Sequence, residues 1–172
     1  DFDMHGERIF LTRDQVSQIV KHLESGIGPI VAVGTTSIRT LESAYWLGVS
    51  ILEDRGYARD GHFELPQWEP YRTRIDQPSA LSAFKAIAEY MDSERIGELP
   101  GVTHLLIVPG YRFRVASALI TNFHIPESTL ILLVAAFVGK ELWRRMYAEA
   151  IENDYRFLSY GDSSILFRSE DK

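Results

Sequence analysis

Apolar residues recur at helical spacing in several segments of the chain. Helices are predicted over residues 12–25, 36–47, 81–91 and 128–138, and a further one after Gly139. In the first, Thr12 and Gln15 fit a capping box before the apolar run, and Gly26 follows its end. Residues 128–138 are apolar on every side after Thr129, which is typical of a helix buried in a core.

Short apolar runs between these segments predict strands. Residues 29–33 and 104–108 are continuous enough for strands covered on both faces. Residues 111–115 alternate apolar side chains with Arg112 and Arg114, which predicts a half-exposed strand with a cationic face. Residues 118–121 are a candidate hairpin partner for it, residues 164–167 a last strand, and residues 48–77 an irregular segment with at most one short strand.

Alternating helices and strands predict an α/β fold. We expect a mixed, mostly parallel sheet flanked by helices, with residues 128–138 as a buried central helix. The 172 residues suit a single domain. Because the chain starts at Asp1 rather than at methionine, we also expect this domain to be part of a larger protein.

Composition narrows the class of protein. The chain has no cysteine, so it can form neither disulfides nor metal sites with thiolate ligands. No apolar run is long enough for a membrane helix, so we expect no membrane partner and a cytoplasmic location. A formal net charge of −6 argues against broad, non-specific binding to nucleic acid. Close arginine pairs, such as Arg112 with Arg114, are consistent with a local basic strip on the surface. The alternative is that they are ordinary solvated surface charges.

Three segments carry residues suited to chemistry. Residues 34–37 (GTTS) lie between a predicted strand and a helix, where backbone N–H groups bind phosphate or carboxylate; the alternative is a glycine turn with a threonine cap. Asn122 and His124 precede the buried helix, and His124 is either a proton-transfer group or a structural histidine. Residues 155–162 place aromatics, a cation and a carboxylate in one loop, for base stacking or for packing.

The histidines are dispersed along the chain and form no metal-binding motif. Nor does a Ser-His-Asp order or a His-Glu-x-x-His motif appear. The residues therefore give no reason to propose a triad hydrolase or a zinc enzyme.

Several motifs together resemble one family. They are MHGE at residues 4–7, VGTTSIRTLES at 33–43, PGYRFR at 109–114, LITNFHIPESTL at 119–130 and YRFLSYGD at 155–162. In this order they resemble the C-terminal part of the S-adenosylmethionine:tRNA ribosyltransferase-isomerases of queuosine biosynthesis. Gly6 departs from the serine usual in the family, and residues 55–101 are longer than the usual link.

The resemblance implies a reaction with two substrates. The ribosyl group of S-adenosylmethionine is transferred and isomerised onto 7-aminomethyl-7-deazaguanine in tRNA, giving epoxyqueuosine and releasing adenine and methionine. The resemblance also implies that S-adenosylmethionine is a co-substrate, that no metal and no further cofactor are needed, and that a missing N-terminal domain is a partner.

The implied reaction makes certain residues candidates for catalysis or for substrate binding. The catalytic candidates are His124, His5 and Asp162, and the substrate-binding candidates are Gly34, Thr35, Thr36, Arg39, Tyr111, Arg112, Arg114, Asn122, Ser128, Tyr155, Arg156 and Tyr160. Two other functions stay open. One is a non-catalytic module that binds tRNA or S-adenosylmethionine, and the other is a generic α/β nucleotide-binding domain.

Overall fold

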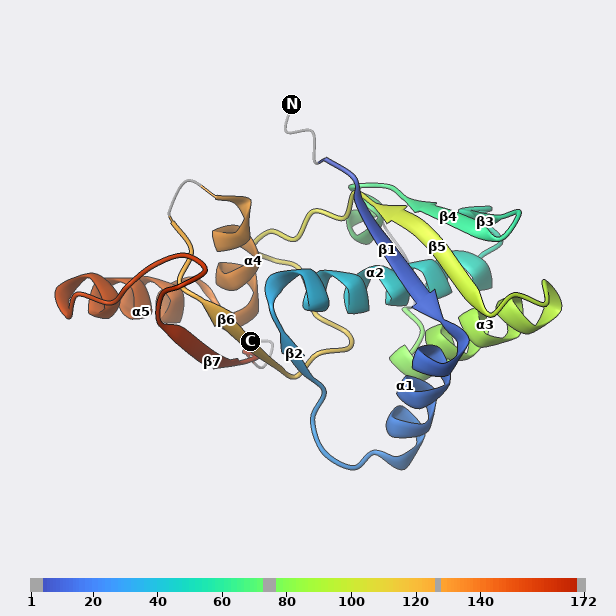
Figure 1. Cartoon of the computed structure of the whole chain (residues 1–172), viewed down its shortest axis with the longest axis horizontal. Coiled ribbons are helices and arrows are strands. Elements are labelled where there is room, and N and C mark those ends of the chain that lie inside the picture. Colours follow the sequence, from blue (N-terminus) through green and yellow to red (C-terminus); the bar gives the residue numbers. More distant parts are fainter. Residues whose placement is uncertain (1–4, 73–76, 126–127, 170–172) are drawn as a thin grey trace. The chain divides into compact units, whose positions relative to one another are not determined.

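The computed structural model describes residues 5–72, 77–125 and 128–169. Their contacts group the chain into two compact units, residues 1–28 with 40–106 and residues 29–39 with 107–172. Each unit has its own sheet (Figure 1). The prediction that residues 1–172 form one domain of a larger enzyme stays a prediction.

The first unit is a four-stranded sheet with helices. Its elements are β1 (Glu7–Thr12), α1 (Arg13–Ser25), most of α2 (Thr35–Leu52), β3 (Ala58–Arg59), β4 (His62–Leu65), a 3-10 helix (Glu69–Tyr71), α3 (Ala80–Ser93) and β5 (Glu98–Thr103). The strand order is β1-β5-β4-β3. Ion pairs from Arg13 to Asp92 (2.8 Å) and from Lys85 to Glu24 (2.7 Å) join α1 and α3.

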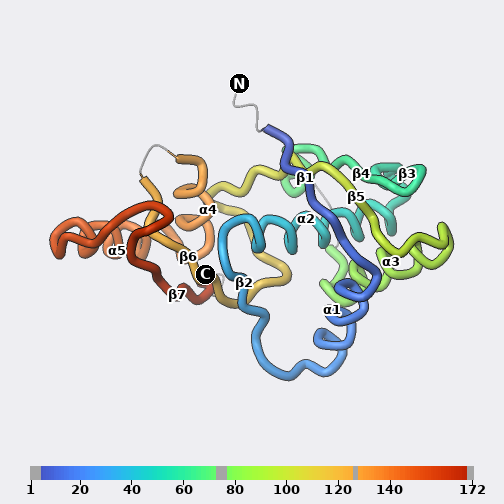
Figure 2. The backbone as a smooth tube through the Cα atoms, viewed as in Figure 1, coloured from blue at the N-terminus to red at the C-terminus, as the bar shows by residue number. Residues whose placement is uncertain are grey.

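The second unit is built on three strands in the order β2-β6-β7. Its elements are β2 (Val31–Val33), the first turn of α2, β6 (Ala118–Asn122), α4 (Thr129–Val138), α5 (Lys140–Glu152) and β7 (Ser163–Phe167). β2 pairs with β6 in parallel, and β7 pairs with β6 antiparallel. In the backbone trace of Figure 2, β6 lies between β2 and β7.

The α/β class and all five helices are confirmed. The capping box of Thr12 and Gln15 is present, and Gly26 ends α1 in the left-handed conformation at φ 62°. α4 is buried along most of its length, as its apolar sequence predicts. Of the motif residues, Met4, Pro126 and Glu127 lie outside the described residues. Among the helices of the described residues, none combines the length and apolar character that a membrane span requires.

The predicted sheet was wrong in two respects. The described residues form two sheets, and neither is mostly parallel. Among these residues β1–β5, β3–β4 and β6–β7 pair antiparallel, whereas β4–β5 and β2–β6 pair in parallel. Residues 104–108 are not a strand; the strand is β5, just before them. β5 contains Pro100 and Gly101, residue types that strand patterns avoid. A Cβ on Gly101 would lie 2.3 Å from the ring of Phe63, so the glycine admits that buried ring.

The predicted strand at residues 111–115, with its hairpin to residues 118–121, was also wrong. Tyr111, Phe113 and Val115 are buried in alternation, but they belong to none of the strands in the part of the chain that the structure describes. The ring of Phe113 instead contacts those of Tyr111 and Phe137, at centroid distances of 4.9 and 4.8 Å. The alternation reflects packing against α4, and β6 pairs with β2 and β7 instead.

Helix α2 continues beyond the predicted end at Leu47, through Gly48 to Leu52. A Cβ on Gly48 would lie 2.2 Å from the carbonyl oxygen of Ala83 in α3. The glycine therefore permits a close approach between two helices rather than ending one.

This contact predicts an unusual sign for a helix substitution. At an open helix position, Gly→Ala stabilises by about 0.5–1 kcal/mol. Gly48→Ala should instead lower the free energy of unfolding by about 1–3 kcal/mol, because the added methyl overlaps the backbone of α3. Chemical denaturation followed by Trp46 fluorescence measures it. Gly97→Ala is the control, since a Cβ there meets nothing within 4 Å. Equal stability of the two variants would contradict the proposed contact.

Candidate functional site

Three segments far apart in sequence meet at one edge of the β2-β6-β7 sheet. Because β2 and β6 are parallel, with Val33 opposite Ile120, their carboxyl ends lie at the same edge. Ser163, the first residue of β7, pairs with Asn122, the last of β6, so Asp162 enters the sheet at this edge too. Ligands of α/β sheets commonly bind beyond the carboxyl ends of the strands. We call this end of the sheet, which includes the residues just after Val33 and Asn122 and just before Ser163, the site edge.

The first segment at the site edge is the turn from β2 into α2. Gly34 has φ 89°, and its N–H donates to the carbonyl of Ile120 at 2.8 Å. The helix starts at once with Thr35, and the hydroxyl of Ser37 donates to the carbonyl of Val33 at 2.7 Å. Thr36 is exposed at the helix N-terminus, where N–H groups and the helix dipole favour an anion. The predicted anion loop has suitable geometry, and binding there stays a prediction.

The second segment carries His124. Its Nε2 lies 3.0 Å from Oγ1 of Thr121, and its backbone N–H donates to the hydroxyl of Tyr147 at 3.2 Å. Partial burial of the ring lowers the pKa of His124 below its usual value, since desolvation disfavours the imidazolium. Burial likewise raises the pKa of Tyr147. At neutral pH the histidine is therefore an uncharged imidazole, the form that accepts a proton.

An aromatic cluster surrounds Phe123, the residue before His124. The ring of Phe123 contacts Tyr147, Tyr155 and Phe157, at centroid distances of 5.6, 5.5 and 5.7 Å. Tyr155 is 42% exposed, so one side of it packs and the other meets solvent. The two interpretations of this loop, stacking and packing, are thus compatible for Tyr155. Tyr160 is 98% exposed, so its ring is open to solvent.

The third segment, residues 155–162, is fastened to the end of β6. Leu158 N–H donates to the carbonyl of Phe123 at 2.8 Å, and the Asn122 side chain donates to the carbonyl of Gly161 at 3.1 Å. The Asp162 carboxylate accepts from the backbone N–H of Arg156 at 2.8 Å and lies 3.6 Å from its guanidinium. Asn122 and Asp162, predicted as binding and catalytic residues, thus also hold the loop in place.

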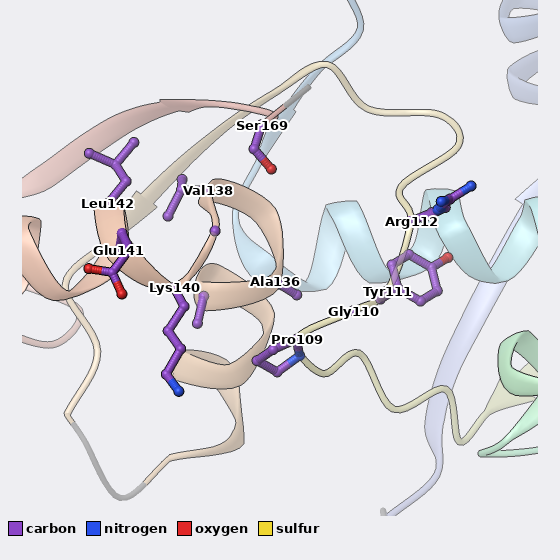
Figure 3. Close-up of a pocket in the computed structure, with 12 residues that line it drawn as sticks. Pro109, Gly110, Tyr111, Arg112, Ala136, Val138, Lys140, Glu141, Leu142 and Ser169 are labelled. Atoms are coloured by element: carbon purple, nitrogen blue, oxygen red, sulfur yellow. The ribbon is translucent and has the colours of Figure 1, made fainter. Parts of the chain in front are cut away.

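A pocket lies in the same unit, between the loop at Pro109 and the junction of α4 and α5 (Figure 3). Its volume is about 770 Å³. Tyr111, Arg112 and Lys140 are among the lining residues. The C-terminal half of α4 lines it, whereas His124 precedes the N-terminal end of that helix. Two predicted binding residues, Tyr111 and Arg112, therefore lie in this pocket rather than with His124.

The remaining candidates are more dispersed. Ser128 caps α4, since its hydroxyl accepts from Leu130 N–H at 3.1 Å. Arg39 is only 5% exposed, inside the first turns of α2, and Arg114 is half-buried. His5 is exposed in the first unit, so the three catalytic candidates do not share one unit. No group of three potential metal ligands occurs among the described residues.

Sequence reasoning missed two neighbours of His124. Thr121 belongs to a strand, and Tyr147 lies on α5, where its helical spacing indicates only a buried face. The sequence did contain one signal for Tyr147. Its phenol lies on the buried face of the helix, and a buried hydroxyl requires a hydrogen-bond partner.

Comparison with known proteins gives the family. A family model described as queuosine biosynthesis protein matches residues 1–166. The chain belongs to this family. An S-adenosylmethionine:tRNA ribosyltransferase-isomerase of Magnetococcus marinus is 38% identical over 164 residues, which are 95% of this chain and 32% of the relative. A relative of the same name from Azoarcus is 36% identical over 97% of this chain and 35% of its own length.

A solved structure agrees with this assignment. The crystal structure of an S-adenosylmethionine tRNA ribosyltransferase from Thermotoga maritima is similar to this chain, with a TM-score of 0.58 and 31% identity. The similarity covers 92% of this chain and 39% of that one. The chain thus spans about a third of the length of the family members it matches.

Burial of His124 predicts a pH dependence of stability. In the unfolded chain the imidazole of His124 has its usual pKa of about 6.5, so it takes up a proton as the pH falls through that value. In the folded chain the pKa is lower, so the unfolded state binds the proton first as the pH falls. The free energy of unfolding should therefore decrease below that pH, and His124→Gln should lose less between pH 8 and pH 5.5. Denaturation midpoints of both proteins measure this, and parallel pH profiles would contradict it.

Proposed function

We propose that this chain is the C-terminal part of an enzyme that modifies tRNA in queuosine biosynthesis. The enzyme transfers and isomerises the ribosyl group of S-adenosylmethionine onto 7-aminomethyl-7-deazaguanine, yields epoxyqueuosine, and releases adenine and methionine. The observation that carries the proposal is the convergence of three family motifs at the site edge. The names of the relatives support the same reaction.

The chemistry requires proton transfer beside the sugar. A sulfonium acidifies the neighbouring C–H bond, and adenine leaves more readily when it is protonated, so the site needs a base and an acid. We assign the base to His124, because desolvation keeps its imidazole neutral and Thr121 and Tyr147 fix its segment. Asp162 is the second proton-transfer candidate, and its hydrogen bond to the backbone of Arg156 orients its carboxylate toward the loop.

The substrates present groups that match the site edge. The methionine carboxylate is an anion of the kind that the N-terminus of α2 favours, beside Gly34 and Thr36. Tyr155, exposed on one side, offers a stacking surface for a base. Arg112 and Arg156 are exposed cations suited to phosphates of tRNA.

A second candidate is a binding module that performs no catalysis alone. The chain's share of its relatives' length, about a third, favours it. In that case His124 and its neighbours form one part of a site to which other residues of the enzyme contribute.

A direct assay separates the two functions. The chain is mixed with precursor tRNA and S-adenosylmethionine, and released adenine is measured by chromatography. We expect release from a protein of the relatives' length that contains this chain. Release from the isolated chain as well would rule out the binding module, whereas no release from the isolated chain would favour it. His124→Ala in the longer protein should lower kcat by about 100-fold or more, because a positioned base contributes 10²–10⁴-fold. Unchanged turnover in His124→Ala would remove it as the base.

The assignment of arginines to tRNA is tested by salt dependence. Each phosphate contact contributes about 0.9 to the slope of log affinity against log salt for a duplex and about 0.7 for a single strand. Arg112→Ala and Arg156→Ala should each lower the slope of tRNA binding by nearly one, measured by filter binding. Arg144→Ala is the matched control, because this exposed arginine of α5 pairs with Glu141 at 3.1 Å and belongs to neither of the two segments assigned to tRNA. Slopes equal to that of the control would assign the two arginines to structure.

A further inference from the structure

One face of the β2-β6-β7 sheet is apolar, and among the described residues its two outer strands are exposed there. The strand register places Val31, Val33, Ala118, Ile120, Ile165 and Phe167 on this face. Four of them are 42%, 65%, 58% and 66% exposed, in the order Val31, Val33, Ile165, Phe167. In the central strand Ala118 is fully buried and Ile120 is half-buried. We call this surface the outer face.

The opposite face of the same sheet is buried. Ala32, Leu119 and Leu166 point to it and are at most 5% exposed. Helix α4 packs there, against β7. We predicted that residues 29–33 would be covered on both faces, and in this structure that was wrong for β2, whose burial alternates along the strand.

Exposure of the outer face conflicts with its composition. β-branched and aromatic side chains in adjacent strands are typical of a sheet with a cover, and parallel strand pairs occur mostly in sheets covered on both faces. Contiguous exposed apolar patches mark interaction surfaces. Single exposed apolar residues such as Ile27 need no such explanation, whereas a set aligned by strand register does.

The comparisons indicate what the cover is. The relatives match over nearly the whole of this chain, but the match spans only about a third of their own length. The Thermotoga structure likewise extends well beyond the part that is similar. A polypeptide about twice the size of this chain therefore accompanies it in the family.

We propose that the outer face is the docking surface for that remaining part of the enzyme. The inference rests on the proposed function in that both treat this chain as part of the longer enzyme. Asn122 and Ser163 lie on the same face, where it reaches the site edge. A segment docked on the outer face therefore adjoins the end of β6 on the side of Asn122. His124 bonds Thr121, which points to the opposite face, so the docked segment would support the site from behind.

The absence of cysteine from the chain makes this testable by labelling. Val33→Cys and Phe167→Cys are made singly, and their reaction with a maleimide is followed by mass spectrometry of this chain. The exposed control is Ile27→Cys, at a residue 77% exposed, and the buried control is Ala32→Cys, 2% exposed on the opposite face of β2. The probe is the unaligned remainder of the Magnetococcus marinus relative, produced as a separate polypeptide.

With the remainder at about ten times its Kd, labelling at Val33→Cys and Phe167→Cys should slow about tenfold, while Ile27→Cys is unchanged. A fusion in which this chain replaces the aligned third of the relative repeats the measurement without a binding step. Full labelling at both outer-face positions in the mixture and in the fusion would overturn the proposal.

Protection that grows with the concentration of this chain alone would also overturn it, because the cover would then be a second copy. Labelling requires no turnover. A result for the outer face therefore stands whether or not adenine release supports the proposed reaction.

Discussion

The parallel pairing of β2 with β6 is the constraint on which the second unit depends. It joins residues almost ninety positions apart, with Val31 opposite Ala118, and the N–H of Gly34 extends it by one more hydrogen bond. The same register decides two properties at once. It brings the carboxyl ends of both strands to one edge, and it separates the buried face of Ala32 and Leu119 from the apolar outer face. A slip of this register by one residue would exchange the buried and the exposed face, and the segments of the site would no longer meet at the site edge.

The end of β6 orders everything that surrounds His124. Residues 155–162 take their position from hydrogen bonds to Asn122 and Phe123, and α5 contributes the hydroxyl of Tyr147. Partial burial of the imidazole lowers the pKa of His124, so packing at the end of β6 also sets the proton affinity of this residue.

The sequence allowed the helices to be predicted, because their signals are local: the capping box at Thr12, the left-handed Gly26, and the uniformly apolar run of α4. Prediction from sequence failed where the structure around a residue depends on a partner that is distant in sequence. Gly48 looked like a helix end because its neighbour Ala83 was not known, and Pro100 and Gly101 concealed a strand that Phe63 packs against. The site followed the same division. Its motifs were recognisable one by one, but their convergence depends on strand register, which local patterns do not encode.

The outer face and the site edge belong to one sheet, and this links stability to function. A cover on Val33 and Phe167 would stabilise β2 and β7, the two edge strands, and both strands carry segments of the site: residues after Gly34 follow β2, and Asp162 precedes β7. Hydrophobic burial is non-directional and requires only area, whereas the proton transfer needs placement to a fraction of an ångström. Docking of a large apolar surface is thus a means to fix a small polar site. The energy of such docking would come from side chains of the outer face, and its effect would reach the site through β2 and β7, the strands next to Gly34 and Asp162.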